Sequence, residues 1–490
     1  MQVSGTICVL LTLVAVVTVK NIRDRFYPRY HLAAPRGWMG KPNGFVMFRG
    51  IHHLFYQFNP NSTRASGALY WGHAKSVNLF HWEHEPIALY PDKWLDKSGA
   101  MAGTAIVEDD TILILYTGRI NHPGEDPDHE EHICFANQYG KQYYKHSLPV
   151  IEGNEHQPNF RDPYFWKYNN MSYALIGSSF LNNTKCRILL YQSQDRIHWS
   201  QISVLYQSDE ILGNMCESPN LFALDDYYVL LFSVPGIKPD GIYYQNSYES
   251  VYVIGDFNYK SYTFVPLTSV HELDHGHDFY GPQTFIDDIG RRILIAWFSV
   301  GTRDYPENED GFAGCMTMPR ELAFGRNHEL IQKPLAHSEH ARGPVVRRGL
   351  GRSNDSVILP DRTGEIIIKS NSKRDVQVYI ESNKNGIVIT YNAKRKLITL
   401  DRGGLDGIRR ANWNPGRRLR WIIYIDASTV ELFCGNGEVT FTSRFFPSGT
   451  VTVRLGELTQ VHVFKVSEMQ RTIHNITSAR KKGFLFMKAH

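Results

Sequence analysis

Short runs of β-branched and aromatic residues, separated by Gly, Asn, Asp and Pro, follow one another from about residue 24 to residue 335. Such runs are typical of β-strands joined by turns. The 3.6-residue periodicity that marks amphipathic helices is almost absent from the same region. The pattern therefore predicts an all-β fold, with clear strands at Thr111–Thr117, Ser172–Gly177, Tyr227–Phe232 and Arg292–Phe298.

A predicted hairpin near the start of this region holds a candidate reactive side chain. Its strands, Phe45–Phe48 and His53–Phe58, flank a tight turn at Arg49-Gly50. The turn formers Pro42-Asn43-Gly44 precede the first strand and would fix the backbone around residues 40 and 41. A rigid turn can hold one side chain at the mouth of a β scaffold, and here that side chain is Lys41.

A weak internal repeat indicates that the strands form equivalent units. Ser76 lies six positions before Trp82, and Ser193 lies six positions before Trp199, with Asn or Asp at the same intermediate place. A strand, a turn and a strand that recur in this way suggest blades of a β-propeller. Two copies leave a stacked β-sandwich open as the alternative.

The composition changes after residue 335. Residues 336–355 are rich in Arg, Gly and polar side chains and are predicted to be a linker, with an edge connection as the alternative. Short alternating strands resume in residues 356–470, which are predicted to form a second, smaller β-sandwich domain packed on the first. The basic tail, residues 471–490, is predicted to be a frayed terminus.

The N-terminus predicts secretion. The apolar run Ile7–Val19 has the length of a signal-peptide core and is too short to span a bilayer, so residues 1–20 are predicted to be a signal peptide; an uncleaved anchor is the alternative. An extracellular glycoprotein fits the glycosylation sequons at Asn61, Asn170, Asn182, Asn354 and Asn475.

The cysteines predict little cross-linking and no metal site. Cys8 would leave with the signal, and the other five are odd in number and far apart, without metal-ligand spacing. We expect at most one or two disulfides and one free thiol among Cys134, Cys186, Cys216, Cys315 and Cys434.

Charge and aromatic content narrow the class of partner. The formal net charge of +4 over 490 residues is small, so nothing requires nucleic acid or a membrane surface as partner, and no cofactor is expected. Aromatic residues make up 13% of the chain, which suits sugar-stacking sites as well as β cores. We therefore expect a small carbohydrate as ligand; the oligomeric state stays open.

Three predicted turns combine charged side chains with a nearby proline. They are residues 38–44, with Lys41; residues 159–164, with Arg161 and Asp162; and residues 215–221, with Glu217. Each alone is typical of a surface turn. On one β scaffold, however, two carboxylates and a guanidinium can form a sugar site, with one carboxyl as acid and the other as a clamp on hydroxyl groups.

These segments resemble the three signature motifs of glycoside hydrolase family 32, the invertases, inulinases and levanases, whose motifs usually read W-M-N-D-P-N-G, R-D-P and E-C-P. The resemblance covers nearly the whole mature chain and implies a five-bladed β-propeller followed by a β-sandwich, with the active site in the central funnel. Further matches, in the family's order, are residues 55–60, 71–74, 98–100, 274–283, 314–322, 426–433 and 445–447.

The resemblance also implies roles for single residues. Glu217 corresponds to the general acid/base, and Asp162, with Arg161, to the transition-state stabiliser that grips fructosyl hydroxyls. Lys41 occupies the position of the nucleophilic Asp. The substrate-binding residues implied by the resemblance are Gln57, Arg161, Ser98, Tyr280, Trp297 and Trp71.

Other departures from the family pattern accompany Lys41. Gly40 replaces Asn, Ser218 replaces Cys, Asn220 replaces Asp, and Ser66 stands where many relatives carry a pocket Trp. A protonated lysine is no nucleophile, and its charge opposes an oxocarbenium-like transition state. Near Glu217 it would also keep that carboxyl ionised and unable to act as an acid.

Two hypotheses follow from the substitution. The first is a secreted β-fructofuranosidase-like hydrolase that acts on sucrose or related β-fructosides by a retaining two-carboxylate mechanism, impaired by Lys41. The alternative is a catalytically inactive relative that binds fructosides. Fructosyl transfer to a sugar acceptor would need the same missing nucleophile.

Overall fold

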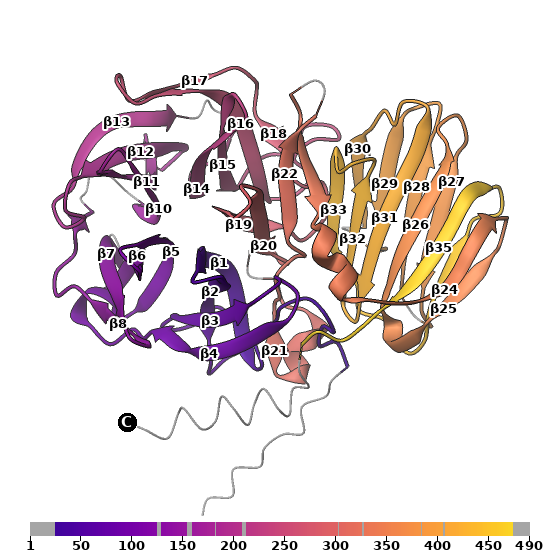
Figure 1. The fold of residues 1–490 in the computed structure, drawn as a ribbon, viewed down its shortest axis with the longest axis horizontal. Coiled ribbons are helices and arrows are strands. Elements are labelled where there is room, and N and C mark those ends of the chain that lie inside the picture. The colour runs from indigo at the N-terminus through magenta and orange to yellow at the C-terminus, as the bar shows by residue number, and fades with distance from the viewer. Residues whose placement is uncertain are drawn as a thin grey trace, which may run out of the picture.

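The computed structural model describes residues 25–473 except 125–128, 154–158, 182, 208–211, 302, 326–327, 384 and 405–406. Its described residues form β-strands and four short 3-10 helices, so the all-β prediction is confirmed. Figure 1 shows sheets arranged around a common centre in the N-terminal part and stacked sheets in the C-terminal part. This arrangement is consistent with a β-propeller joined to a β-sandwich.

Five antiparallel sheets make up the N-terminal part, and a short parallel pairing adds β21 to the first of them. Their strands, sheet by sheet, are β1 (Gly37–Phe48), β2 (Ile51–Asn59), β3 (Tyr70–Ser76), β4 (Trp82–Leu89) and β21 (Phe312–Ala313); β5 (Gly99–Glu108), β6 (Thr111–Asn121), β7 (His129–Tyr139), β8 (Gln142–Lys145) and β9 (Ile151–Glu152); β10 (Arg161–Tyr168), β11 (Met171–Phe180), β12 (Lys185–Ser193) and β13 (Ser200–Gln207); β14 (Glu217–Leu224), β15 (Tyr227–Pro235), β16 (Tyr248–Asn258), β17 (Thr263–Pro266) and β18 (His271–Glu272); and β19 (Tyr280–Ile286), β20 (Arg292–Trp297), β22 (Arg320–Phe324) and β23 (Leu330–Pro334). The 3-10 helices η1 (Trp94–Asp96) and η2 (Pro306–Asp310) lie in connections between them.

The first long strand of each sheet faces the centre of the N-terminal part (Figure 1). Strand β1 contacts β5, β5 contacts β10, β10 contacts β14, β14 contacts β19, and β19 contacts β1 again. The five strands thus form a closed cycle, which brings segments that lie far apart in the chain to one central site.

The internal repeat forms the same turn in two of these sheets, between β3 and β4 and between β12 and β13. Asn78 and Asp195 each accept, through Oδ1, hydrogen bonds from the backbone N–H groups two and three residues later. Trp82 and Trp199 each donate the indole N–H to a backbone carbonyl three residues earlier. The matching side chains therefore mark structurally equivalent connections, as the sequence predicts.

Two six-stranded antiparallel sheets form the C-terminal part and enclose a core of aliphatic and aromatic side chains. One sheet contains β24 (Arg342–Gly351), β35 (Val461–Met469), β26 (Gly364–Asn371), β31 (Arg418–Asp426), β32 (Thr429–Cys434) and β33 (Val439–Arg444). The other contains β25 (Ser356–Leu359), β34 (Val451–Leu455), β27 (Val376–Glu381), β28 (Gly386–Asn392), β29 (Leu397–Asp401) and β30 (Ile408–Asn412).

The predicted linker, residues 336–355, is more ordered than expected. It contains the 3-10 helix η3 (Ala336–His340) and strand β24, which pairs with β35 at a sheet edge. Exposed Arg and Gly residues fit an edge strand because one side of its backbone faces solvent. A last 3-10 helix, η4 (Pro360–Arg362), follows β25.

A buried ionic network joins the two parts. Arg320 on β22 pairs with Asp274 at 3.0 Å and with Glu431 on β32 at 2.6 Å. His31 lies between Glu431, at 3.0 Å, and Asp426, at 2.9 Å. The side chains of all five residues are fully buried. Because buried charges are stable only when paired, this network ties the orientation of the C-terminal part to that of the centre.

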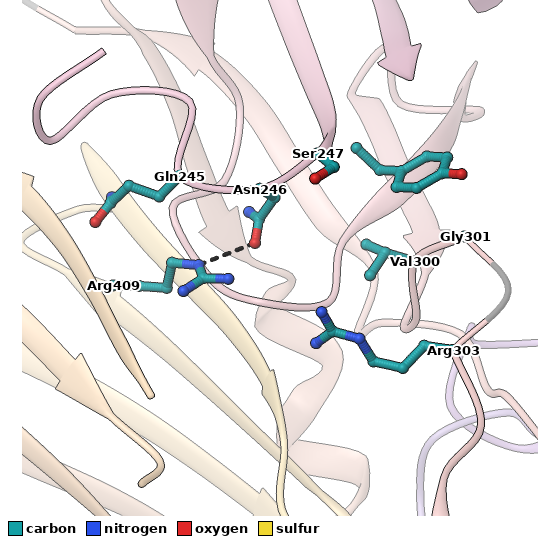
Figure 2. Close-up of a pocket in the computed structure, with 8 residues that line it drawn as sticks. Gln245, Asn246, Ser247, Val300, Gly301, Arg303 and Arg409 are labelled. Carbon is teal, nitrogen blue, oxygen red and sulfur yellow. Dashed lines mark hydrogen bonds between the residues drawn. The ribbon is translucent and has the colours of Figure 1, made fainter. Parts of the chain in front are cut away.

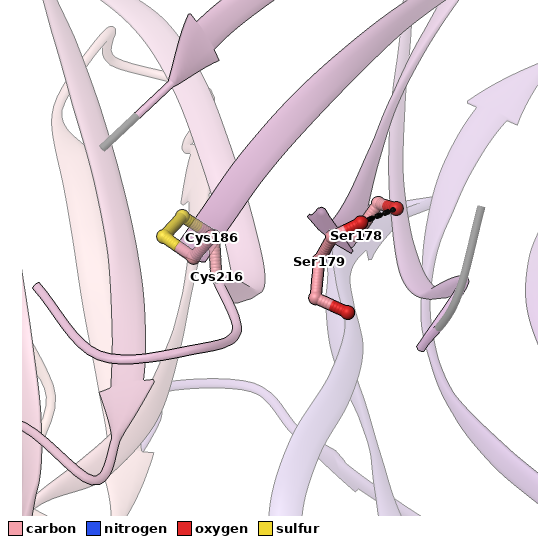
Figure 3. The surroundings of a disulfide bond; sticks show 4 residues. All are labelled: Ser178, Ser179, Cys186 and Cys216. Atoms are coloured by element: carbon pink, nitrogen blue, oxygen red, sulfur yellow. Dashed lines mark hydrogen bonds between the residues drawn. A yellow bond between two sulfur atoms is a disulfide. The ribbon is translucent and has the colours of Figure 1, made fainter. Parts of the chain in front are cut away.

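One disulfide joins Cys186 on β12 to Cys216, the residue before Glu217, with 5.1 Å between the Cα atoms (Figure 3). It confirms the expectation of one or two bridges. The expectation of a single free thiol is wrong for the described residues, because Cys134, Cys315 and Cys434 are all free and buried. Each lies in tightly packed surroundings, where a thiol serves as a small apolar side chain.

Several predictions lie outside the described residues: the signal peptide (1–20), residues 474–490 of the tail, and the sequons at Asn182 and Asn475. The other three sequon residues, Asn61, Asn170 and Asn354, are exposed. In the part of the chain that the structure describes, no helix has the length and apolar character needed to cross a membrane.

Candidate active site

The five central strands share an irregularity at their entrance. Each one shifts register by skipping two residues close to its start, between Met39 and Pro42, Ala100 and Gly103, Arg161 and Tyr164, Glu217 and Asn220, or Tyr280 and Gln283. A bulge of this kind bends the strand and re-aims a side chain. The five bulges thus surround one place at the centre.

The three predicted turns are in fact these bulges. Residues 38–44, 161–164 and 217–220 lie inside the strands β1, β10 and β14. Proline has no backbone N–H, so inside an unbroken ladder it would leave a carbonyl of the neighbouring strand without a donor. At the break in each ladder this loss does not arise, and proline is tolerated there. The prolines and their neighbours correctly predicted an irregular backbone at these three places. The strands continue beyond the irregular residues, so the irregularities are bulges and not turns.

Lys41 reaches from β1 to both predicted catalytic carboxylates. Its Nζ donates to Oδ2 of Asp162 at 2.7 Å and to Oε2 of Glu217 at 3.2 Å. Lys41 is 8% exposed and Asp162 is 3% exposed. The ammonium therefore lies between the two carboxylates in a nearly dry site, where electrostatic attraction is much stronger than in water.

Lys41 and Glu217 stabilise one another's charged forms. Burial by itself would lower the pKa of Lys41, but the carboxylates of Asp162 and Glu217 outweigh burial and raise that pKa above its ordinary value. Burial would likewise raise the pKa of Glu217, but Lys41 and Arg161 hold it well below its usual range. At neutral pH the site thus contains an ammonium and an ionised Glu217.

Arg161 links Glu217 to a further carboxylate. Its Nη2 donates to Oε1 of Glu217 at 2.9 Å, and its Nη1 lies 3.3 Å from Oε2 of Glu131. Glu131, on β7, also accepts hydrogen bonds from Arg119 on β6. Burial of Glu131 is outweighed by the two guanidinium groups, which lower its pKa. The result is a buried chain of alternating charges that ends at Glu217.

Asp162 is held by donors other than Lys41. Its Oδ2 accepts from the backbone N–H and the hydroxyl of Ser218, both at 3.1 Å, and its own N–H donates to Oγ1 of Thr117 at 2.9 Å. Asp162 and Ser218 have φ angles of 61° and 48°, in the left-handed region. Non-glycine residues adopt this strained conformation where the surroundings require it, commonly at functional sites.

Two glycines leave room for neighbouring side chains, Lys41 and Trp38. A Cβ on Gly281, whose φ is +56°, would lie 2.4 Å from Cδ of Lys41. A Cβ on Gly40 would lie 2.1 Å from the ring of Trp38, which fills that space. The Lys41 side chain therefore fits in this position because residue 281 has no side chain. The larger Asn that the family carries at position 40 would clash with Trp38 where Trp38 lies here.

Tyr280 lies in the site as the resemblance implies. Its hydroxyl donates to Oε2 of Glu217 at 2.8 Å. Burial and the Glu217 carboxylate raise the pKa of Tyr280 well above its ordinary value, so the phenol stays protonated. Gln57, on β2, is 6% exposed and lies opposite the bulge of β1, since its neighbours Tyr56 and Phe58 pair with Pro42 and Met39.

The next two predicted residues are Trp297 and Ser98. Trp297 is buried on β20, pairs with Tyr280 across the ladder and contacts Trp38 edge to face, with ring centroids 5.5 Å apart. Ser98 precedes β5, and its hydroxyl accepts from the N–H of Asn121 at 2.9 Å. Both therefore support the wall and rim of the site.

Trp71, the last predicted substrate-binding residue, lies between sheets. It is fully buried, and its indole N–H donates to the carbonyl of Met101 at 2.6 Å. It packs in an apolar cluster with residues of β2, β5 and β6. Its ring and its donor are thus both used in packing between sheets, and its role in substrate binding stays a prediction.

Ser66 and Asn220 also have structural partners. The carbonyl of exposed Ser66 accepts from the amide of Asn59. Asn220 accepts from the N–H and hydroxyl of Thr284 and donates to the carbonyls of Ser218 and Pro282, so it ties β14 to β19. An amide can do both, whereas the family's Asp could only accept.

Sequence reasoning missed Glu131, Arg119 and Thr117, and it included Gly281 only as part of the matched segment 274–283. The three missed residues come from strands β6 and β7, at positions with no shared motif or spacing. The only available signal was their position near strand ends, which becomes informative once the sheets are known to surround one centre. Among the described residues, no group of three or more His, Cys, Asp or Glu side chains is placed to hold a metal ion.

The sequence model of the glycosyl hydrolases family 32 N-terminal domain matches residues 31–334, and that of the family 32 C-terminal domain matches residues 346–479. Together they cover most of the chain. The chain belongs to glycoside hydrolase family 32.

Relatives within family 32 include characterised sugar hydrolases. The sucrose-6-phosphate hydrolase of Escherichia coli is 32% identical over 440 residues, which cover 86% of this chain and 90% of that protein. The raffinose invertase of Escherichia coli is 30% identical over 445 residues, with the same coverage. A mutant of the Bombyx mori GH32 β-fructofuranosidase, solved in complex with sucrose, is 34% identical with a TM-score of 0.87 and covers 93% of this chain and 96% of that chain.

Proposed function

We propose that this protein recognises the fructosyl unit of sucrose or a related β-fructoside, and that its hydrolytic rate is strongly reduced by Lys41. The observation that carries the proposal is the contact of one ammonium with both site carboxylates, at 2.7 and 3.2 Å. Recognition is supported by Arg161, Asp162, Glu217 and Tyr280, which are gathered at the same place. Sugar hydroxyls are bound by such side chains in low-dielectric sites.

Loss of rate follows from the roles that a retaining mechanism needs. One carboxylate must attack the anomeric carbon while a second carboxyl, about 5 Å away, donates a proton to the leaving oxygen. A protonated Lys41 supplies no attacking electron pair, and an ionised Glu217 has no proton to give. Asp162 is fixed by Ser218, Thr117 and Lys41, so it is not free to move into the attacking position.

A second candidate is a fructoside-binding protein without turnover. It is favoured by the same ion pairs, because they satisfy the charges of the site in the absence of any substrate. The two candidates differ in residual hydrolysis. A slow release of glucose and fructose from sucrose that Glu217→Gln abolishes would support the impaired hydrolase, and no release above the uncatalysed background would support the binding protein.

Recognition itself is tested by isothermal titration calorimetry with sucrose and fructose. We expect heat of binding at millimolar sugar, weakened by Arg161→Gln and unchanged by Arg395→Gln, an exposed control on the C-terminal part. No heat from either sugar at millimolar concentration would overturn the proposal of recognition.

We also propose that the five N-terminal sheets are the blades of a five-bladed β-propeller and that the two C-terminal sheets form a β-sandwich. Support comes from the closed cycle of central strands and from the bulge that each of them repeats. An experimental structure with a number of blades other than five would contradict this.

Secretion is proposed from the apolar N-terminal run and from the exposed sequon residues. Expression in a eukaryotic secretory host tests it. We expect protein in the medium, with a new N-terminus close to residue 20 and a mass that falls after treatment with an N-glycosidase. Retention of the uncleaved chain inside the cell would contradict the proposal.

A further inference from the structure

Trp94, in the 3-10 helix η1 just before β5, presents an exposed indole at the surface. The residue is 54% exposed, whereas the next two residues of η1, Leu95 and Asp96, are fully buried. The Asp96 carboxylate accepts hydrogen bonds from the hydroxyl of Tyr116 at 2.8 Å and from the backbone N–H of Lys93 at 3.1 Å. The helix that carries the indole is thus anchored, so a ligand that stacks on the ring would not have to order it first.

A cluster of polar side chains lies beside this indole. The ring of His132, on β7, has its centroid 6.4 Å from that of Trp94. Nε2 of His132 lies 3.3 Å from Oε2 of Glu130, whose Oε1 lies 3.4 Å from Nε2 of His122. Within the described part of the chain, neither ring nitrogen of His132 has a hydrogen-bond partner, although its side chain is only 11% exposed. We call Trp94, His122, Glu130 and His132 the rim patch.

The composition of the rim patch suits a sugar ring. One face of such a ring carries C–H groups, which pack on an aromatic face, and its edge carries hydroxyl groups. The half-exposed carboxylate of Glu130 can accept from two neighbouring hydroxyls, and each imidazole of the patch can donate or accept. Buried polar atoms without partners are costly, so the ring nitrogens of His132 favour a ligand that supplies those partners.

The rim patch lies at the end of its sheet that carries the central bulge of β5. Its residues precede β5, follow β6 and begin β7, and antiparallel strands place these three positions at one end of the sheet. Side chains alternate along a strand, so Glu130 and His132 point to one face of β7 and Glu131 points to the other. Glu131 accepts from Arg161, which donates to Glu217. A ligand bound at the centre thus has to cross the end of only one sheet to reach the rim patch.

A longer ligand could also extend toward a cavity of about 320 Å³ at the boundary of the two parts (Figure 2). Polar groups there already link the two parts, since Nε of Arg409 donates to Oδ1 of Asn246 at 2.9 Å, and Asn246 donates to Glu249 at 3.0 Å. The aromatic residue of this cavity, Tyr248, packs on Tyr280, with ring centroids 5.6 Å apart. The rim patch, by contrast, offers an exposed ring.

We propose that the rim patch binds an outer sugar unit of a β-fructoside longer than sucrose, with that ring stacked on Trp94 and its hydroxyl groups bonded to Glu130 and His132. The inference rests on the proposed recognition of a fructosyl unit at the centre. It adds that the preferred ligand is an oligosaccharide and that Trp94 determines this preference.

The test is calorimetric titration of the full-length protein with sucrose, the trisaccharide 1-kestose and the tetrasaccharide nystose. We expect at least one of the two longer sugars to bind about tenfold more tightly than sucrose, because one aromatic contact and one hydrogen bond to a charged group together account for such a factor. A gain that first appears with nystose would mean that the rim patch binds the fourth sugar unit rather than the third.

Trp94→Ala is the informative variant, because a ring exposed to this extent contributes little to the packed core. We expect it to remove the gain for the longer sugars and to leave sucrose affinity unchanged. Trp94→Phe, which keeps an aromatic face, should retain most of the gain, and Glu130→Gln, which loses the charged acceptor, should reduce it. Tyr139→Ala is the matched control: it removes a 77% exposed ring at the opposite end of β7 and should have no effect.

The inference is overturned if sucrose binds as tightly as both longer sugars, or if Trp94→Ala leaves their gain intact or weakens sucrose to the same extent. It is also overturned if Arg303→Ala, at the cavity in Figure 2, removes the gain instead of Trp94→Ala, because the outer sugar units would then bind at the boundary of the two parts. Failure of the proposed function would look different, since none of the three sugars would bind. The two failures are therefore distinguishable.

Discussion

The Nζ atom of Lys41 donates to Oδ2 of Asp162 over 2.7 Å, although the two residues lie 121 positions apart in the chain. The contact forms because the bulges of β1 and β10 aim both side chains at the same centre. Around it, Glu217 pairs with the ammonium, Ser218 and Tyr280 donate to the two carboxylates, and Gly281 leaves space for the Lys41 side chain. The first of the following predictions rests on this arrangement.

Gly281→Ala tests whether the site is built around the length of Lys41. The new Cβ would meet the Lys41 methylenes, whose far end is held by two ion pairs, and the φ of +56° adds backbone strain. We expect a loss of about 2–4 kcal/mol in the free energy of unfolding, the sum of overpacking and left-handed strain. Denaturant unfolding monitored by fluorescence measures it.

The matched control is Gly290→Ala, at a φ of +83° with open space around it. It should cost only about 1 kcal/mol of strain. In a Lys41→Ala background, the cost of Gly281→Ala should fall toward the same value. Equal costs of Gly281→Ala with and without Lys41 would show that the two residues are not coupled.

His31 predicts a loss of stability at alkaline pH. Burial would lower its pKa, but Asp426 and Glu431 outweigh burial and raise it from 6.5 to about 9. Because the folded-state pKa lies above the unfolded value, the stabilisation is fully present below pH 6.5 and is lost as pH rises through about 9. The shift corresponds to a decrease on the order of 3 kcal/mol.

Unfolding midpoints measured from pH 6 to pH 9.5 check this prediction. His31→Gln should lower the midpoint at pH 6 and flatten its decline toward pH 9.5. His198→Gln, which changes an exposed histidine paired with Asp195, should leave the pH dependence as it is. A midpoint that does not fall between pH 6.5 and 9.5 in the natural protein would contradict the assigned charge of His31.

The disulfide Cys186–Cys216 is expected to hold the segment that carries Glu217. Replacing both cysteines with Ala removes a cross-link between residues 30 positions apart and should cost about 2–4 kcal/mol. Reductant should lower the melting temperature of the natural protein by a comparable amount and leave that of the double variant unchanged. The same response to reductant in both proteins would show that the bridge does not form.

The strand content and the central side chains could be predicted from local sequence, because strand propensity and the turn signals around Pro42, Pro163 and Pro219 are local properties. The bulges could not be told from turns, since that depends on whether extended strands continue on both sides. The role of Trp71 stays a prediction, because a buried indole and a sugar-stacking indole look the same in a sequence. Glu131 and Gly281 act through strands that only the assembled sheets bring together.

The edge strand β24 was missed for a related reason. Its Arg- and Gly-rich composition resembles a linker, and only pairing with β35, more than a hundred residues later in the chain, makes it a strand. Local propensity carries no information about such partners.

The most direct test is the release of glucose and fructose from sucrose by the natural protein, by Lys41→Asp and by Lys41→Ala. Lys41→Asp supplies an attacking carboxylate and removes the ammonium that holds Glu217 ionised; Lys41→Ala only removes the ammonium. We predict slow or absent turnover in the natural protein, a gain of at least about a hundredfold in Lys41→Asp, and less than about tenfold in Lys41→Ala. Turnover by the natural protein at ordinary enzyme rates, unaffected by Lys41→Ala, would contradict the conclusion that the cation at position 41 limits catalysis.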